Sequence, residues 1–273
     1  MVNFPAGLLV VDIDGTLVGR DGTVSAADRT ALLRVRDSGV AVSLCTGRAV
    51  KSCSAIFREL PLDGYHIFFD GALVTAPGHR DEIYVRYLDP AVVEAAAGFA
   101  RSHGLYLELY SSDDYFVEAE TQFSALRRQY FGLEPVVGGF AGLWYRQRII
   151  KAGFVTASAQ EAEGSRRFQL EFRERLSFTR ARSPAFPDLT FINVIAPGVS
   201  KGEALVALAG NLGVPLERVM AIGDGENDIP LFKRVGLSVS MGGAPPEVKA
   251  AANYITLDLA QAGVGAAVAR FLF

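Results

Sequence analysis

Two acidic residues, Asp12 and Asp14, follow the apolar run of residues 8–11 and precede Gly15. Four apolar residues in succession predict a strand that is buried on both faces, as in a parallel sheet covered by helices. At positions i and i+2 of an extended chain the two side chains point the same way, and neighbouring anions repel unless a cation or a proton intervenes. Because ligands bind at the carboxyl ends of such strands, the pair indicates a functional site.

A second acidic segment, residues 223–228, repeats this arrangement near the other end of the chain. The apolar run 219–222 predicts another buried strand, which brings Asp224 to the same sheet edge, with Asp228 one helical turn later. The dipole of a helix accounts for single acidic residues in its first turn. Convergence of three carboxylates from two strands instead favours a hard divalent cation, and Mg²⁺ fits because it accepts few carboxylates and completes its shell with water and phosphate.

Lys201 is a candidate for contact with an anion. Ser200 and Glu203 form the pattern of a capping box that opens a helix, and Lys201 lies in the first turn, where the dipole disfavours a cation. We therefore expect a neighbouring anion, either Asp12 or a bound phosphate. A solvated lysine is the simpler alternative.

Thr46, Gly47 and Arg48 follow another predicted strand, residues 40–45. The threonine hydroxyl and the free backbone N–H groups before a helix form a small cradle for an anion. Taken alone, this signal is weak.

Strands alternate with helices in both end regions of the chain, which predicts an α/β fold with a doubly wound parallel sheet. The expected strands are residues 8–12, 40–45, 66–69, 219–223, 237–241 and 254–257. The middle region instead shows extended segments in pairs, at 82–88, 105–110, 115–118, 149–156, 177–182 and 189–195. Pairs of this kind predict a separate α+β unit with a mostly antiparallel sheet.

The resumption of the first pattern predicts that one domain hosts an insertion. We expect the host domain to comprise residues 1–80 and 190–273, and the inserted unit to comprise residues 81–189. Because its entry points follow the carboxyl edge of the sheet, the inserted unit is expected to form a lid over the site.

The composition limits the partners and the location. The chain has 273 residues, of which 50% are hydrophobic, and its net charge of -3 gives no reason to expect a nucleic acid or an anionic membrane. No basic segment precedes an apolar stretch at the N-terminus, so no signal peptide is expected. Cys45 and Cys53 are too few for a disulfide framework, which favours the cytoplasm. The oligomeric state is not predicted.

Four segments together resemble, in type and order, the motifs of the haloacid dehalogenase (HAD) superfamily: residues 12–16, Thr46, Lys201 and residues 223–228. The insertion resembles the α/β-capped subclass, and the best likeness is to Cof-type sugar-phosphate phosphatases. The resemblance covers about residues 5–75 and 190–273. It implies a Rossmann-like core with an inserted α+β cap, and an Mg²⁺-dependent phosphatase that acts on a small phosphate ester, in the first place a sugar phosphate.

The resemblance also implies roles for individual residues. Asp12 would be the nucleophile that forms an aspartyl-phosphate, and Asp14 would protonate the leaving alcohol and then deprotonate water. The phosphoryl oxygens would be bound by Thr46, Gly47, Lys201 and Asn227. Mg²⁺ would be held by Asp12, the backbone carbonyl of Asp14, Asp224 and, from the second layer or through water, Asp228.

Two alternative functions remain open at this point. Capped relatives include phosphomutases, which pass the phosphoryl group to a second hydroxyl of the sugar. A non-catalytic sugar-phosphate sensor would keep the binding site, although binding alone does not require an acid/base at Asp14. Dephosphorylation of a protein is disfavoured, because a large cap excludes bulky substrates.

One position departs from the resembled family, which commonly has Asn-Gly-Ala where this chain has Asp70, Gly71 and Ala72. An ionised acid cannot donate a hydrogen bond as an amide does, so we expect a structural turn here rather than a substrate contact. The histidines lack metal-ligand spacing and are expected to be structural: His66, His79 and His103. Four aromatic residues of the insertion either line a sugar pocket or pack in its core: Tyr106, Tyr110, Tyr115 and Trp144.

Overall fold

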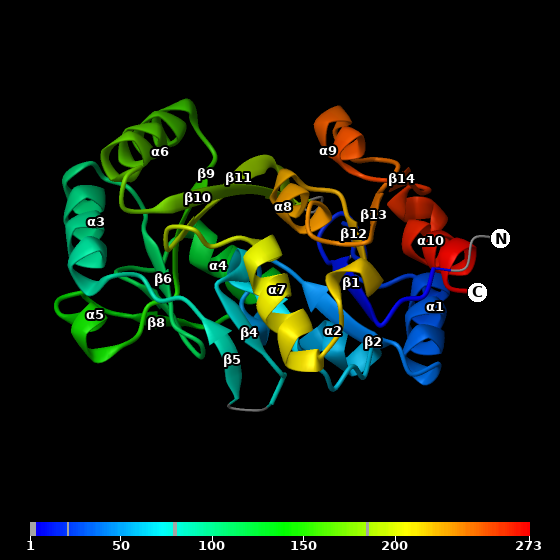
Figure 1. The fold of residues 1–273 in the computed structure, drawn as a ribbon. Helices are drawn as coiled ribbons and strands as arrows, with labels where there is room; N and C mark the ends of the chain where they lie inside the picture. Colours follow the sequence, from blue (N-terminus) through cyan, green and yellow to red (C-terminus); the bar gives the residue numbers. More distant parts are fainter. Residues whose placement is uncertain (1–3, 21, 79–80, 184–185) are drawn as a thin grey trace.

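The computed structural model describes residues 4–20, 22–78, 81–183 and 186–273. Two lobes lie side by side, and each is built on one sheet (Figure 1). His79 lies outside the described residues. Within the described residues, no helix combines the length and the apolar character needed to cross a membrane.

The first lobe contains, within the described residues, an eight-stranded sheet in the order β14-β13-β12-β1-β2-β3-β4-β5. The strands from β14 to β3 are parallel to one another, whereas β4 and β5 add to the edge in antiparallel fashion. Their bounds are β1 Leu8–Asp12, β2 Ala41–Cys45, β3 His66–Phe68, β4 Leu73–Thr75, β5 Glu82–Val85, β12 Val219–Gly223, β13 Leu237–Ser240 and β14 Tyr254–Ile255.

Helices cover both faces of this sheet. The side chains of β1 point alternately to the two faces, and those on each face pack in a separate apolar cluster. Leu9 and Val11 pack in the cluster that contains residues of α1, α2 and α10. Leu8 and Val10 pack in the cluster that contains residues of α7, α8 and α9. These helices are α1 Ala26–Asp37, α2 Ser54–Glu59, α7 Lys201–Leu212, α8 Ile229–Phe232, α9 Pro246–Ala251 and α10 Gly263–Phe271. The predicted doubly wound α/β sheet is confirmed.

The second lobe contains, among the described residues, a six-stranded sheet in the order β10-β11-β9-β6-β7-β8. Only the pair β7–β8 of this described sheet is parallel, so it is mostly antiparallel, as expected. Its strands are β6 Glu108–Tyr110, β7 Tyr115–Val117, β8 Pro135–Val137, β9 Lys151–Thr156, β10 Ser177–Ser183 and β11 Phe186–Ile195. Its helices are α3 Pro90–Ser102, α4 Gln122–Phe131, α5 Leu143–Arg146 and α6 Ala159–Phe172.

Aromatic packing fixes α3 and α6 on one face of this second sheet. Phe168 of α6 stacks edge-on against Phe154 of β9, with ring centroids 4.6 Å apart, and Phe99 of α3 lies 5.7 Å from Phe168. The residues on the opposite face of β9 and β11, among them Lys151 and Asn193, are therefore left to face the first lobe.

The sequence-based assignment of one strand was wrong. We expected residues 82–88 in the inserted unit, but β5 pairs with β4 and belongs to the first sheet. The hydrophobic pattern of a short strand shows which of its faces is buried, but it does not show which sheet the strand joins. The limits of the inserted unit, residues 81–189, stay a prediction.

Candidate active site

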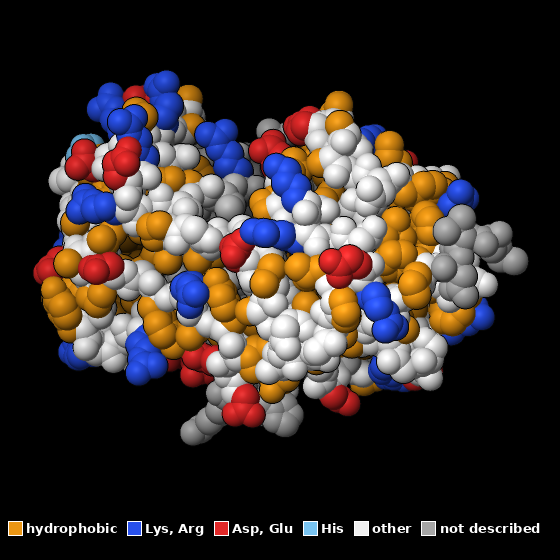
Figure 2. Space-filling model, in the orientation of Figure 1, with side chains coloured by type: hydrophobic (Ala, Val, Ile, Leu, Met, Phe, Trp, Pro, Cys, Tyr) orange, Lys and Arg blue, Asp and Glu red, His pale blue; other side chains and the backbone are white. Residues whose placement is uncertain are grey.

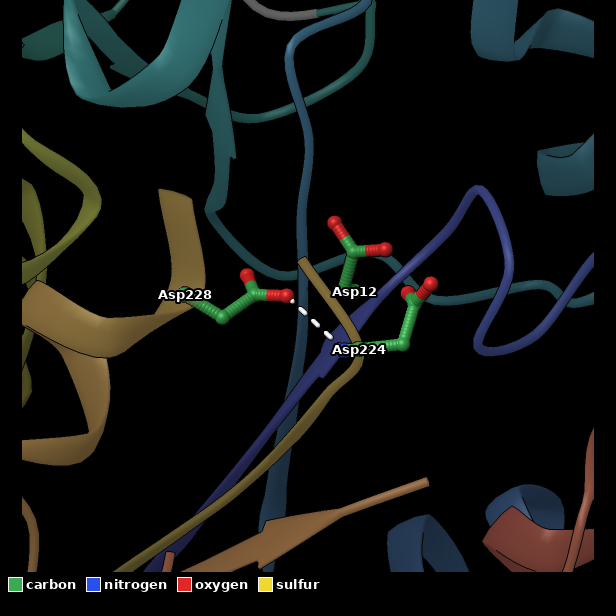
Figure 3. Close-up of side chains that lie close together, drawn as sticks. All are labelled: Asp12, Asp224 and Asp228. Carbon is green, nitrogen blue, oxygen red and sulfur yellow. Dashed lines mark hydrogen bonds between the residues drawn. The ribbon is translucent and has the colours of Figure 1, made fainter. Parts of the chain in front are cut away.

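Neighbouring strand ends bring the acidic residues together. Strands β1 and β12 are parallel partners, with Val11 opposite Ile222, so both deliver a carboxylate to the same edge. Oxygen atoms of Asp12, Asp224 and Asp228 all lie within 4.8 Å of one another (Figure 3). The structure thus gathers three carboxylates from the two segments that the sequence singled out.

Lys201 joins two of these carboxylates. Its Nζ donates to Oδ1 of Asp12 and to Oδ1 of Asp228, both at 2.6 Å, and the residue is only 1% exposed. Burial opposes the charge on Lys201, but the two carboxylates outweigh it, and the pKa lies well above its ordinary value. The anion beside Lys201 is therefore Asp12, as one alternative held, and the solvated lysine is excluded. The expected capping box is half formed, because Glu203 pairs with Arg234.

Asp228 shapes the loop after β12. Its Oδ2 accepts a hydrogen bond from the backbone N–H of Asp224 at 3.0 Å (Figure 3) and another from the backbone N–H of Gly225 at 2.9 Å. A Cβ atom on Gly223 would lie 2.4 Å from this oxygen, which explains the glycine at the strand end. Both oxygens of Asp228 are thus occupied by protein donors, in keeping with a second-layer role.

Asp224 is fixed from the N-terminal motif. Thr16 Oγ1 donates to Oδ1 of Asp224 at 2.7 Å. Gly15 has a φ of +88°, and a Cβ atom there would lie 2.3 Å from Asp224 Oδ2, so the turn requires glycine for conformation and for space. The Thr16 hydroxyl thus connects the N-terminal motif to the second acidic motif.

The carboxylate cluster fits a divalent cation. Burial raises the pKa of Asp12 well above its ordinary value. Burial, followed by the negative charge of Asp228, raises the pKa of Asp224 to about 7. Among the described residues, Oδ2 of Asp12 and Oδ2 of Asp224 accept no protein hydrogen bond. Two oxygen ligands next to a water-accessible cavity match the preference of Mg²⁺. The Asp14 carbonyl as a third ligand stays a prediction.

Asp14 has a different partner from Asp12. Arg48 Nε donates to its Oδ2 at 2.8 Å and Arg48 Nη2 to its Oδ1 at 2.6 Å, in a two-pronged ion pair. Burial opposes the charge on Arg48, but Asp14 prevails and raises the pKa of the guanidinium. Sequence reasoning assigned Arg48 only to the anion cradle and missed this contact, although a basic residue two positions after Thr46 was its signal.

Thr46 and Gly47 line the same cavity as the acidic residues. Oγ1 of Thr46 accepts from the backbone N–H of Arg48 at 3.1 Å, so the hydroxyl proton remains available to a ligand. The carbonyl of Gly47 accepts from Lys151 Nζ at 2.9 Å. This last contact joins the first lobe to β9 of the second.

Both lobes line the cavity, which has a volume of about 570 Å³. The first lobe contributes Asp12, Asp14, Thr46, Gly47, Arg48, Asp224 and Asn227, among others. The second lobe contributes Tyr110, Arg127, Phe131, Lys151, Arg180, Phe191 and Asn193, among others. The second lobe thus lies over the strand ends, where the sequence placed a lid. Of the aromatic residues left open, Tyr110 lines the cavity, whereas Trp144 is buried and does not.

Asp70 connects the lobes from within. The residue is 1% exposed, with a φ of +55°, and its carboxylate accepts from Asn227 at 2.8 Å, Thr179 at 3.0 Å and Asn193 at 2.6 Å. Three donors on two oxygens explain an acid here, since an amide has one acceptor oxygen. The expected turn is present, and its side chain also holds Asn227 at the cavity wall. Sequence reasoning missed this role.

Several other polar residues do not line the cavity. His66 is buried and bonded to the backbone of Leu44 and Leu62, and His103 stacks on Phe99. Both cysteines are free and buried. Figure 2 shows Lys and Arg side chains gathered over α6, where exposed Arg166 and Arg167 pair with Glu163. None of these groups takes part in the cavity.

Comparison with known proteins identifies relatives over nearly the whole chain. A family model described as haloacid dehalogenase-like hydrolase matches residues 9–268. The 5-amino-6-(5-phospho-D-ribitylamino)uracil phosphatase YwtE of Bacillus subtilis is 25% identical over 288 aligned positions, with 94% of each chain covered. The HMP-PP phosphatase of Klebsiella pneumoniae is 27% identical over 250 positions, covering 90% of this chain and 87% of the relative.

Solved structures share the whole architecture. A haloacid dehalogenase-like hydrolase from Bacteroides thetaiotaomicron superimposes with a TM-score of 0.85 at 25% identity, covering 97% of this chain and 99% of the other. A sugar phosphatase of HAD subclass IIB gives a TM-score of 0.81 at 21% identity, covering 97% and 98%. At that identity the second likeness concerns the fold alone.

Proposed function

Since the chain belongs to the haloacid dehalogenase-like hydrolases, in their Cof-type phosphatase branch, we propose that it is an Mg²⁺-dependent phosphatase of small phosphorylated metabolites, in the first place sugar phosphates. The observation that carries this proposal is the position of Asp12. This buried carboxylate lies at the wall of a cavity of about 570 Å³, between Lys201 and the Asp224 carboxylate. Cavities of roughly 300–1,000 Å³ hold small molecules.

Asp12 acts as the nucleophile in this proposal. Lys201 opposes the effect of burial on the pKa of Asp12 and so favours the ionised carboxylate. It also holds Asp12 by Oδ1, so the side chain is oriented before substrate binds. Attack on phosphorus forms the bond between aspartate oxygen and phosphorus and breaks the ester bond to the alcohol. Water then attacks the aspartyl-phosphate, which returns the carboxylate and releases phosphate.

Asp14 supplies and removes the protons. In the first step its proton passes to the leaving alcohol, and in the second step it takes a proton from the attacking water. Each oxygen of Asp14 accepts one hydrogen bond from Arg48, so the guanidinium must release the oxygen that is to carry and transfer the proton. We therefore expect bound substrate to displace at least one Arg48 contact while Asp14 carries a proton.

The phosphoryl oxygens are bound by groups that still have a proton to donate. On the cavity wall these are the Thr46 hydroxyl, the Gly47 backbone N–H and the Asn227 amide, which Asp70 orients. Lys201, which is buried beside Asp12, is the fourth. Mg²⁺, held by Asp12, Asp224 and the Asp14 carbonyl, would offset charge on these oxygens. The free, buried cysteines support the proposal of a cytoplasmic location.

The test is phosphate release from a panel of sugar phosphates, nucleotides and 4-nitrophenyl phosphate, with Mg²⁺ and with chelator. We expect release that depends on the metal and is lost in Asp12→Asn, whereas Asp37→Asn, which alters an exposed carboxylate, retains it. No release from any ester by the folded protein with Mg²⁺ would contradict the proposal. Isomerised sugar phosphate without phosphate release would indicate a mutase, and binding without turnover a sensor.

A further inference from the structure

Lys151 carries a buried charge that the protein does not neutralise. The residue begins β9 and is 6% exposed, and its Nζ donates to the backbone carbonyl of Gly47 at 2.9 Å. Among the described residues, no carboxylate lies within 4.0 Å of this ammonium group. A carbonyl satisfies one of its three N–H donors but contributes no negative charge.

Three other basic residues in or beside the cavity differ in this respect. Lys201 has Asp12, Arg48 has Asp14, and Arg127 has the fully buried Glu108 at 2.8 Å. A charge that leaves water is stable only when it is paired or finds a partner in a ligand. Lys151 therefore stands out as a buried cation on the cavity wall that still lacks its anion.

The nearest acidic groups are already engaged. Asp70 accepts hydrogen bonds from Asn193, Thr179 and Asn227. Glu108 accepts from Arg127, Tyr110 and Tyr115. Neither carboxylate forms an ion pair or a hydrogen bond with Lys151 in the described part of the chain, although each favours the charge of Lys151 through space.

Lys151 keeps its positive charge under ordinary conditions. Burial lowers the pKa of its ammonium group to about 8, with the charge of Asp70 acting in the opposite direction. At neutral pH the protonated form predominates.

The position of Lys151 is that of a contact for the alcohol part of the substrate. Its Nζ lies next to Gly47, which follows Thr46 in the proposed phosphoryl cradle, and it shares the cavity with Asp14, the proposed proton donor to the leaving oxygen. Arg180 of β10 lines the same cavity and forms no ion pair among the described residues. The second lobe thus adds two basic groups without an ion-pair partner among the described residues to the cavity in which the leaving group would lie.

We propose that Lys151, supported by Arg180, binds an anionic group on the alcohol part of the substrate, so that the preferred esters carry a second anion, either a carboxylate or another phosphoryl group. This inference rests on the phosphatase function proposed above. It narrows the substrate class from phosphate monoesters in general to doubly charged ones, and it gives the second lobe a defined part in selecting them.

Two pairs of matched esters test the preference. One pair is 3-phosphoglycerate and glycerol 3-phosphate, which differ by a carboxylate, and the other is the bisphosphate and the monophosphate of 1,3-propanediol. We expect kcat/KM to be at least about tenfold higher for the doubly charged member of one pair, the effect of one charge-assisted hydrogen bond. The pair that shows the preference identifies the kind of anion.

Substitution assigns the preference to Lys151. In Lys151→Met, which keeps the length of the side chain without its charge, we expect the ratio within that pair to fall to about threefold or less, as for a lost charge-assisted contact. Lys151→Arg retains most of the ratio, Arg180→Gln reduces it in part, and Lys233→Met, which alters an exposed lysine, leaves it unchanged.

The outcomes separate this inference from the proposed function. Hydrolysis of 4-nitrophenyl phosphate by wild-type protein with no preference in either pair overturns the assignment of Lys151 and leaves the phosphatase intact. An equal loss for both members of a pair in Lys151→Met also overturns it. If Lys151→Met does not fold, the kcat/KM ratios of the wild-type protein and of Arg180→Gln still show whether the second anion of the substrate is recognised. Absence of hydrolysis of every ester overturns the proposed function itself.

Discussion

Two aspartates separated by one residue have been given different surroundings. Asp12 is almost fully buried and bonded to an ammonium group, whereas the Asp14 side chain is 26% exposed and bonded to a guanidinium. The ammonium group favours the ionised carboxylate that a nucleophile requires, against the effect of burial. The partial exposure of Asp14 gives it access to the water and substrate with which it would exchange protons. Different surroundings of this kind allow one active site to use two carboxylates in two different roles.

Arg48→Lys tests the positioning of Asp14. Lysine keeps the charge but cannot offer two parallel N–H donors, so we expect kcat to fall by roughly 10–100-fold for a sugar phosphate, within the contribution of general acid catalysis. For 4-nitrophenyl phosphate the loss in kcat should be smaller, because its leaving group needs little protonation.

The matched control is Arg36→Lys, which alters an exposed arginine paired with Asp37 and should leave both rates unchanged. Equal losses for the two substrates in Arg48→Lys would show that Arg48 acts on binding or folding rather than through Asp14.

His66 links stability to pH. The N–H of Leu44 donates to its Nδ1, so Nε2 carries the proton and donates to Leu62, and burial lowers the pKa to about 4 from 6.5. The contribution of neutral His66 is therefore fully present above pH 6.5 and is lost as the pH falls towards 4.

We expect this group to remove about 3 kcal/mol from the free energy of unfolding across that interval, at about 1.36 kcal/mol per pKa unit. Urea unfolding at several pH values measures the slope. His66→Asn keeps an acceptor for Leu44 and should lose the excess slope; an unchanged slope would assign the acid sensitivity to other groups.

At the level of the elements, the sequence predicted what depends on neighbours in the chain. Buried strands end in the residues of the site, so Asp12, Thr46 and Asp224 could be placed at one sheet edge from hydrophobic runs alone. The sheet that β5 joins, and the contacts of Lys151 and Asp70, depend on how the second lobe meets the first. No local pattern in the chain encodes that geometry, and these parts of the site became visible only in the structure.

Asp70 holds two elements of the second lobe against the first. In Asp70→Asn the backbone conformation is still tolerated, because asparagine adopts positive φ as readily as aspartate, but one acceptor oxygen must serve three donors. We expect a loss of about 1–3 kcal/mol in the free energy of unfolding, the cost of leaving buried donors unpaired.

Denaturant unfolding measures this loss, and limited proteolysis should cut the second lobe faster. Asp63→Asn, at an exposed position, serves as control. Wild-type stability and protection in Asp70→Asn would mean that Asp70 does not join the lobes.

The whole molecule should respond to the metal even without substrate. Any ion that binds the folded chain alone stabilises it, by about 2.7 kcal/mol at a concentration of 100 times Kd. We therefore expect Mg²⁺ to raise the Tm above its value in chelator, and Asp224→Asn to abolish the rise. Calorimetric scans measure both. A Tm that does not respond to millimolar Mg²⁺ would contradict a site formed by Asp12 and Asp224.

The pairing of β1 with β12 also has a consequence for biosynthesis. Strand β1 is among the first elements to leave the ribosome, but its partner on one side begins only at Val219. Until then one edge of β1, the edge away from β2, has no partner strand in the nascent chain. Unpaired edges of apolar strands of this kind can pair with other chains. The same delay keeps Asp12 apart from Asp224 and Lys201, so the catalytic centre comes into existence only when synthesis is nearly complete.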